Sequence, residues 1–108
     1  INGFTIPINT FGPGLSIAHR GTIVVNGAAR IGANCRIHVC VNIGTSKDHS
    51  VDAPMIGDNV YIRPGAKLFG PIEIADNCVI GANAVVNKSC LIKGATILGV
   101  PGKIYKNE

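Results

Sequence analysis

Large aromatic side chains are scarce in this chain of 108 residues. It has no tryptophan, two tyrosines and three phenylalanines, although 46% of its residues are hydrophobic. The net charge is +4, but proteins that bind single-stranded nucleic acid also need aromatic platforms on which bases stack. No apolar run reaches the roughly 20 residues of a membrane-spanning helix. A core of small and aliphatic side chains remains, which suits a narrow interior and favours neither nucleic acid nor membrane as a partner.

Aliphatic residues recur at a spacing of six along most of the chain. This ladder, with one interruption, consists of Val25, Ile31, Ile37, Ile43, Ile56, Ile62, Leu68, Ile74, Ile80, Val86, Ile92 and Leu98. A period of six matches neither the helical period of about 3.6 nor the strand period of 2. It is typical of a hexapeptide β-helix, in which the chain returns to the same inward position once per repeat.

Two further features complete the repeat. A small or modest apolar residue stands two places before most ladder positions: Ala29, Cys35, Val41, Val60, Ala66, Ile72, Cys78, Ala84, Cys90 and Thr96. Since residues two apart on a strand share a face, each repeat has two inward side chains. Asn or Gly, which tolerate positive φ, stands three places after a ladder position at Asn34, Asn59, Gly65, Asn77 and Asn83, which predicts corners.

The repeat predicts an all-β fold. Three strands and three corners give a triangular coil of about eighteen residues, and stacked coils give a parallel β-helix shaped as a prism. Residues 1–108 are expected to form one domain, with one protruding loop and a short tail at about 101–108.

The same repeat accounts for most of the cysteines. Cys35, Cys78 and Cys90 occupy inward positions that alanine or valine fills in other repeats, whereas Cys40 lies off this line near a corner. No Cys-X-X-Cys pair is present, which disfavours a zinc or redox site. Buried free thiols are the expected state, and they fit a reducing cytoplasm. No bound metal is expected.

Positions where the ladder breaks are candidates for a functional site. The break between Ile17 and Val25 contains His19, which is expected to face outward near a corner. His38 directly follows Ile37, and positions 17 and 37 lie on one side of the prism, one coil apart. Because adjacent strands are about 4.8 Å apart, His19 and His38 are predicted neighbours. Either both serve the chemistry, or His38 holds His19 in position.

A second break inserts a loop at about residues 45–55. It carries Lys47, Asp48, His49 and Asp52. Solenoids accept insertions as loops, often on the binding face. Two interpretations stay open: a solvated loop, or an arm that closes over a cleft, with Asp48 and His49 contacting the substrate.

Four stretches share a family pattern: Gly14–Val25, Val39–Gly44, Ile80–Val86 and Leu98–Lys103. In them the chain resembles the hexapeptide-repeat acyltransferases, specifically the serine acetyltransferase branch. The resemblance implies a single-stranded left-handed β-helix and a homotrimer with active sites between neighbouring prisms. It also implies an O-acetyltransferase that takes its acetyl group from acetyl-CoA.

The resemblance extends to single residues. His19 would be the general base, because imidazole titrates near pH 6.5. Acetyl-CoA would lie along the late coils, and the residues expected to contact it, with an oxyanion donor near the first of them, are Gly44, Ala66, Gly81, Ala82, Lys88, Lys93 and Lys103.

The chain departs from the serine acetyltransferase pattern around this histidine. Ala18 stands where that branch has Asp, residues 4–8 contain no carboxylate, and Asp48-His49 replaces an Arg-His pair. The expected acceptor is therefore a hydroxyl of serine or of a sugar, as in surface-polysaccharide synthesis. Two alternatives stay open. One is a non-catalytic trimeric scaffold, and the other is a zinc enzyme like the γ-type carbonic anhydrases, which use three histidines.

Overall fold

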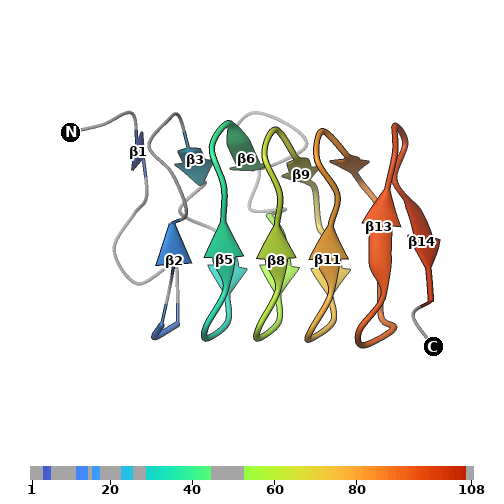
Figure 1. Cartoon of the computed structure of the whole chain (residues 1–108), viewed down its shortest axis with the longest axis horizontal. Coiled ribbons are helices and arrows are strands. Elements are labelled where there is room, and N and C mark those ends of the chain that lie inside the picture. Colours follow the sequence, from blue (N-terminus) through green and yellow to red (C-terminus); the bar gives the residue numbers. More distant parts are fainter. Residues whose placement is uncertain are drawn as a thin grey trace.

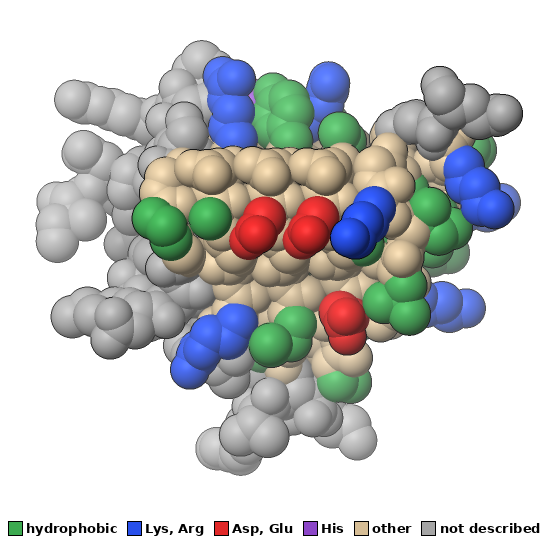
Figure 2. All heavy atoms as spheres, turned by 90° about the horizontal axis from the view of Figure 1, so that it is seen from below, with side chains coloured by type: hydrophobic (Ala, Val, Ile, Leu, Met, Phe, Trp, Pro, Cys, Tyr) green, Lys and Arg blue, Asp and Glu red, His purple; other side chains and the backbone are tan. Residues whose placement is uncertain are grey.

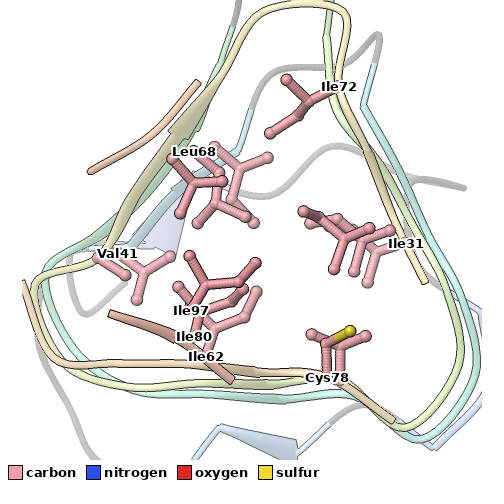
Figure 3. Close-up of a cluster of buried hydrophobic side chains, with 14 of the residues drawn as sticks. Ile31, Val41, Ile62, Leu68, Ile72, Cys78, Ile80 and Ile97 are labelled. Carbon is pink, nitrogen blue, oxygen red and sulfur yellow. The ribbon is translucent and has the colours of Figure 1, made fainter. Parts of the chain in front are cut away.

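The computed structural model is a parallel β-helix whose cross-section is a triangle (Figures 1 and 3). The structure describes residues 4–5, 12–14, 16–17, 23–25, 29–44 and 53–106. Within them the chain winds through short strands that stack into three sheets, which we call faces A, B and C. The predicted β-helix architecture is therefore confirmed.

Each face is a stack of strands from successive coils. Face A has the order β1 (Phe4–Thr5), β3 (Ile23–Val25), β6 (Val41–Gly44), β9 (Lys67–Phe69) and β12 (Val85–Val86). Face B has the order β4 (Arg30–Ile31), β7 (Met55–Ile56) and β10 (Glu73–Ile74). Face C has the order β2 (Ser16–Ile17), β5 (Arg36–Ile37), β8 (Tyr61–Ile62), β11 (Val79–Ile80), β13 (Thr96–Leu98) and β14 (Lys103–Tyr105). All pairs are parallel except β13 with β14, so part of the segment predicted as a tail is a strand that folds back onto face C.

Ladder residues stack on their counterparts one coil away. Ile37 pairs with Ile62 and Ile62 with Ile80 on face C, and each of the three side chains is fully buried. Figure 3 looks along the prism axis and shows the buried side chains of the three faces pointing into a narrow interior. The spacing leaves room for aliphatic side chains only, which explains why the described core contains no aromatic residue.

The predicted corners are confirmed by the backbone. Asn34, Asn59, Asn77 and Asn83 have φ between 58° and 63°, and Gly65 has φ of 78°. This left-handed region costs Asn and Gly little.

Acidic side chains line the edge where face B leads into face C. The Asp58 carboxylate accepts the backbone N–H of Ala33 at 2.8 Å, and the Asp76 carboxylate accepts that of Asp58 at 2.7 Å. Figure 2 looks onto this edge and shows two acidic side chains next to each other along it. Each carboxylate therefore ties its own corner to the corner of the preceding coil.

The sequence ladder is wrong at its last two positions. Ile92 and Leu98 are 38% and 45% exposed, whereas Ile97 is 1% exposed and pairs with Ile80. The inward position two residues before the ladder position also shifts by one residue, because Ala95 is buried and Thr96 is not. The step from Ile80 to its partner is seventeen residues where the preceding step on this face is eighteen, so the repeat loses one residue in the last coil.

All four cysteines are free, as predicted. Cys35, Cys78 and Cys90 are buried, and Cys40 is exposed at a corner with φ of 60°. Burial raises the pKa of the Cys35 thiol. Burial, with Cys90 beside it, raises the pKa of Cys78 to about 11. The Cys35 and Cys78 thiols therefore stay protonated at neutral pH, and the three buried cysteines serve as core packing groups.

The predicted loop falls in the sequence between a strand of face A and a strand of face B. β6 ends at Gly44, and Ala53, which is buried in the core, already belongs to the next coil. Residues 45–52 between them lie outside the described residues. Among the described residues no helix has the length and hydrophobicity needed to cross a membrane.

Candidate functional site

The predicted catalytic and loop residues fall on different parts of the chain. His19, Asp48 and His49 lie outside the described residues. The strand before His19 is described, and in it Ile17 pairs with Ile37. The predicted alignment of these two coils is therefore confirmed.

His38 lies just beyond the end of β5, where face C turns toward face A. We call this the C–A edge, and its corners are Val39–Cys40, Pro64–Gly65 and Ala82–Asn83. The imidazole is only 8% exposed, and its Nε2 lies 2.7 Å from the Tyr61 hydroxyl. The two rings are 5.2 Å apart between centroids, with planes inclined at 31°. This hydrogen bond fixes the orientation of the imidazole.

Tyr61 is a candidate site residue that the sequence analysis missed. It begins β8 at the outward position between the buried residues Val60 and Ile62, where the repeat places no constraint on the side chain. Its Cα partner on β5 is Arg36. The guanidinium carbons of Arg36 and Arg63 lie 5.4 Å and 5.2 Å from the Tyr61 ring centroid. The signal available in the sequence was the register, because it places residue 61 beside residues 36 and 38.

A groove begins beside this cluster and continues toward the last coil. Its volume is about 390 Å³, and its lining residues are Arg63, Val79, Gly81, Ala82, Thr96 and Leu98. The structure thus brings two predicted CoA contacts, Gly81 and Ala82, into one groove on the C–A edge. Arg63 at its start was not predicted.

The backbone of Ala82 is open to a ligand. In the preceding coils the corner carbonyls of Val39 and Pro64 accept the N–H groups of Gly65 and Asn83, respectively. Ala82 holds the equivalent corner of the next coil. None of the backbone hydrogen bonds in the described part of the chain uses its N–H or C=O. A donor and an acceptor are therefore presented together at the groove.

The other predicted CoA contacts do not gather there. Ala66 is fully buried, and its N–H and C=O bond to Arg63 and Asn42. Lys93 lines a separate depression of about 860 Å³ across face B. The remaining three fall as follows: Gly44 at the end of β6, Lys88 exposed just after β12, and Lys103 on β14 opposite Leu98. Of these residues only Lys103 lies beside the groove, at its far end.

Comparison with known proteins finds similarity to one class of transferase. Residues 53–88 match the family described as bacterial transferase hexapeptide (six repeats). The chain also superposes on a serine acetyltransferase in complex with CoA with a TM-score of 0.81 and 32% identity, over 89% of this chain and 39% of that one. Since a helix of the opposite hand would not superpose, the β-helix has the left-handed twist of these transferases.

Individual relatives are serine acetyltransferases. The chain is 41% identical over 98 residues to a serine acetyltransferase of Staphylococcus aureus, covering 90% of this chain and 46% of the relative. It also matches soybean serine acetyltransferase, with a TM-score of 0.83 and 32% identity over 88% of this chain and 39% of that one. The predicted resemblance to the serine acetyltransferase branch is confirmed. The chain spans about half the length of these curated relatives.

Proposed function

We propose that this chain is the catalytic β-helix of a CoA-dependent O-acetyltransferase, with a hydroxyl of serine or of a sugar as acceptor. The observation that carries the proposal is the C–A edge, which joins the His38 cluster to a groove with an unused donor and acceptor at Ala82. The pantetheine arm of CoA is a chain of amides, and such amides pair with free backbone groups. The CoA complexes of two similar serine acetyltransferases support this choice of donor.

We infer that the complete site lies between two copies of the chain in a homotrimer. The predicted loop falls in the sequence between β6 of face A and β7 of face B, whereas His38 and the groove lie on the C–A edge. One copy therefore presents the two parts of the site on different edges. A threefold arrangement can bring the loop of one copy, with Asp48 and His49, against the C–A edge of the next.

His19 is the proposed general base. It takes the proton from the acceptor hydroxyl while the hydroxyl oxygen attacks the carbonyl carbon of the acetyl thioester. The carbon–sulfur bond then breaks, the acetyl group stays on the acceptor oxygen, and the imidazolium returns its proton to the CoA thiolate. Alignment of both substrates in one groove supplies much of the rate enhancement. Ala18 provides no carboxylate to orient the imidazole, so a neighbouring coil must do so.

His38 and Tyr61 are suited to that orienting role. The pairing of Ile17, two residues before His19, with Ile37, the residue before His38, supports this role. His38 is itself held by the Tyr61 hydroxyl. In this proposal the His38–Tyr61 pair packs against the His19 imidazole and holds it in one orientation. The free thiols and the use of acetyl-CoA fit a cytoplasmic enzyme.

The direct test is a screen of acetyl-CoA turnover by the purified protein with serine and with a panel of sugars. Release of free thiol that depends on one acceptor, together with that acceptor's acetylated product, is the expected result. Acetyl-CoA binding without turnover on any acceptor would favour the non-catalytic scaffold instead. Metal analysis of the same preparation tests the zinc-enzyme alternative.

The groove assignment predicts that Ala82→Pro weakens CoA binding. Pro64 fills the equivalent corner one coil earlier, so proline fits this backbone and the substitution removes mainly the N–H donor. Loss of one hydrogen bond of about 0.5–1.5 kcal/mol should raise the Kd for CoA about two- to tenfold, with little change in Tm. Calorimetric titration measures the change. Ala82→Ser keeps the N–H and is the control; equal binding by the proline variant and the parent would refute the contact.

A further inference from the structure

Face C carries two arginines beside one tyrosine. Arg36 and Arg63 both lie against the Tyr61 ring, with guanidinium carbons within 5.4 Å of its centroid. We propose that Arg36, Tyr61 and Arg63 form a subsite for an anionic group of the acceptor, either a carboxylate or a phosphate. This inference rests on the proposed acetyl transfer and narrows the acceptor to molecules that carry a negative charge.

The two guanidiniums keep their charge available. The carboxylates among the described residues are Asp58 and Asp76, on the edge between faces B and C, and Glu73, on face B. None of them forms an ion pair with Arg36 or Arg63 within the described part of the chain. Both guanidiniums contact the Tyr61 ring, which attracts a cation without neutralising its charge.

The geometry suits an anion better than a further protein contact. Arginine presents several N–H donors in a plane and binds carboxylate or phosphate through two parallel hydrogen bonds. Both arginines are exposed, while Tyr61 between them is half-buried and fixed through its hydroxyl to His38. An anion bound at the arginines would therefore lie beside the Tyr61 ring, whose hydroxyl is hydrogen-bonded to His38.

The position along the prism distinguishes the acceptor from CoA. The groove begins at Arg63 and passes through Gly81 and Ala82 to Leu98, whose partner on β14 is Lys103. If the thioester reaches toward the histidine end, the CoA phosphates point toward Lys103. The arginine subsite lies at the opposite end, three to four strands from Lys103, or roughly 14–19 Å at about 4.8 Å per strand. It therefore serves the second substrate.

The fluorescence of Tyr61 can serve as an intrinsic probe for this subsite. The chain has no tryptophan and two tyrosines, so in a Tyr105→Phe background Tyr61 is the remaining tyrosine. D-glucuronate and D-glucose form a matched pair of ligands, because they differ by one carboxylate. Glucuronate and glucose 1-phosphate should change the tyrosine emission saturably, and glucose should not. Equal responses to glucose and glucuronate would overturn the subsite.

Charge-neutral variants locate the binding. Arg36→Gln and Arg63→Gln, each in the Tyr105→Phe background, should weaken glucuronate binding about tenfold or more, because each removes a charged hydrogen-bonding partner. Arg30→Gln, on face B, removes the same charge elsewhere and is the matched control. Unchanged affinity in both test variants, or an equal loss in Arg30→Gln, would contradict the proposal. Circular dichroism verifies that all three fold alike.

A CoA titration separates the two possible anions. Arg36→Gln, at a residue that does not line the groove, should bind CoA within twofold of the parent. Weaker CoA binding with unchanged glucuronate binding would assign the arginines to a CoA phosphate and overturn the proposal. Because these titrations do not depend on turnover, they report on the subsite even if the acetyl-transfer screen is negative. In active protein, the arginine variants should raise KM for a charged acceptor more than KM for acetyl-CoA.

Discussion

His19→Ala is expected to remove nearly all acetyl transfer while CoA binding and the oligomeric state are retained. A positioned general base contributes about 10²- to 10⁴-fold to such a step, so kcat should fall by that factor. The loss arises because the acceptor hydroxyl, with its high pKa, attacks the thioester poorly unless its proton is removed during the attack. Release of CoA thiol under saturating substrates measures the effect, and calorimetric CoA titration verifies binding.

The pH profile adds a second readout to this experiment. In the parent protein kcat/KM should fall as the pH is lowered, because a protonated imidazole accepts no proton. In His19→Ala that decline should disappear from the residual rate. Arg30→Gln, which lies on face B outside the proposed site, should keep both the rate and the profile. Full activity in His19→Ala would remove His19 from the mechanism, and attention would shift to His38.

The fold was predictable because the hexapeptide repeat is a direct consequence of geometry. An inward side chain once per strand and a positive-φ residue at each corner are requirements of the backbone, and Ile62 and Asn59 satisfy them visibly in the sequence. The cysteines could be placed for the same reason, since Cys78 occupies a slot that otherwise holds alanine or valine. Each of these predictions rests on local spacing, which the sequence records directly.

The candidate site was less predictable because it depends on which residues meet across coils. The hydrogen bond between His38 and Tyr61 joins residues 23 positions apart, and the interval contains the inserted loop. Arg36, Tyr61 and Arg63 occupy outward positions, where the repeat accepts any side chain. Lys93 was predicted as a CoA contact from the family pattern and its charge, and its place on the lining of the depression across face B was not evident from the sequence. Register, rather than residue type, decides these contacts.

The loss of one residue in the last coil has a measurable consequence at Ile97 and Leu98. The six-residue ladder places Leu98 in the core, whereas the structure buries Ile97 and leaves Leu98 nearly half exposed. Ile97→Ala should therefore lower the free energy of unfolding by about 2–5 kcal/mol, because it deletes buried methyl groups and leaves a cavity. Leu98→Ala should cost about 1 kcal/mol or less, because much of that side chain is already in water.

Urea unfolding at one fixed protein concentration compares the two variants, since the stability of an oligomer depends on its concentration. Ile62→Ala, on the same stack two coils earlier, sets the scale for a fully buried ladder residue. A larger loss of unfolding free energy at Leu98 than at Ile97 would show that the strict six-residue period holds in the last coil. Leu98 would then point into the core and would not line the groove. We expect the loss of unfolding free energy at Ile97 to be close to that at Ile62, and the loss at Leu98 to be far smaller than both. This order would show that the shortened coil shapes the groove, because only that register directs Leu98 outward beside Gly81 and Ala82.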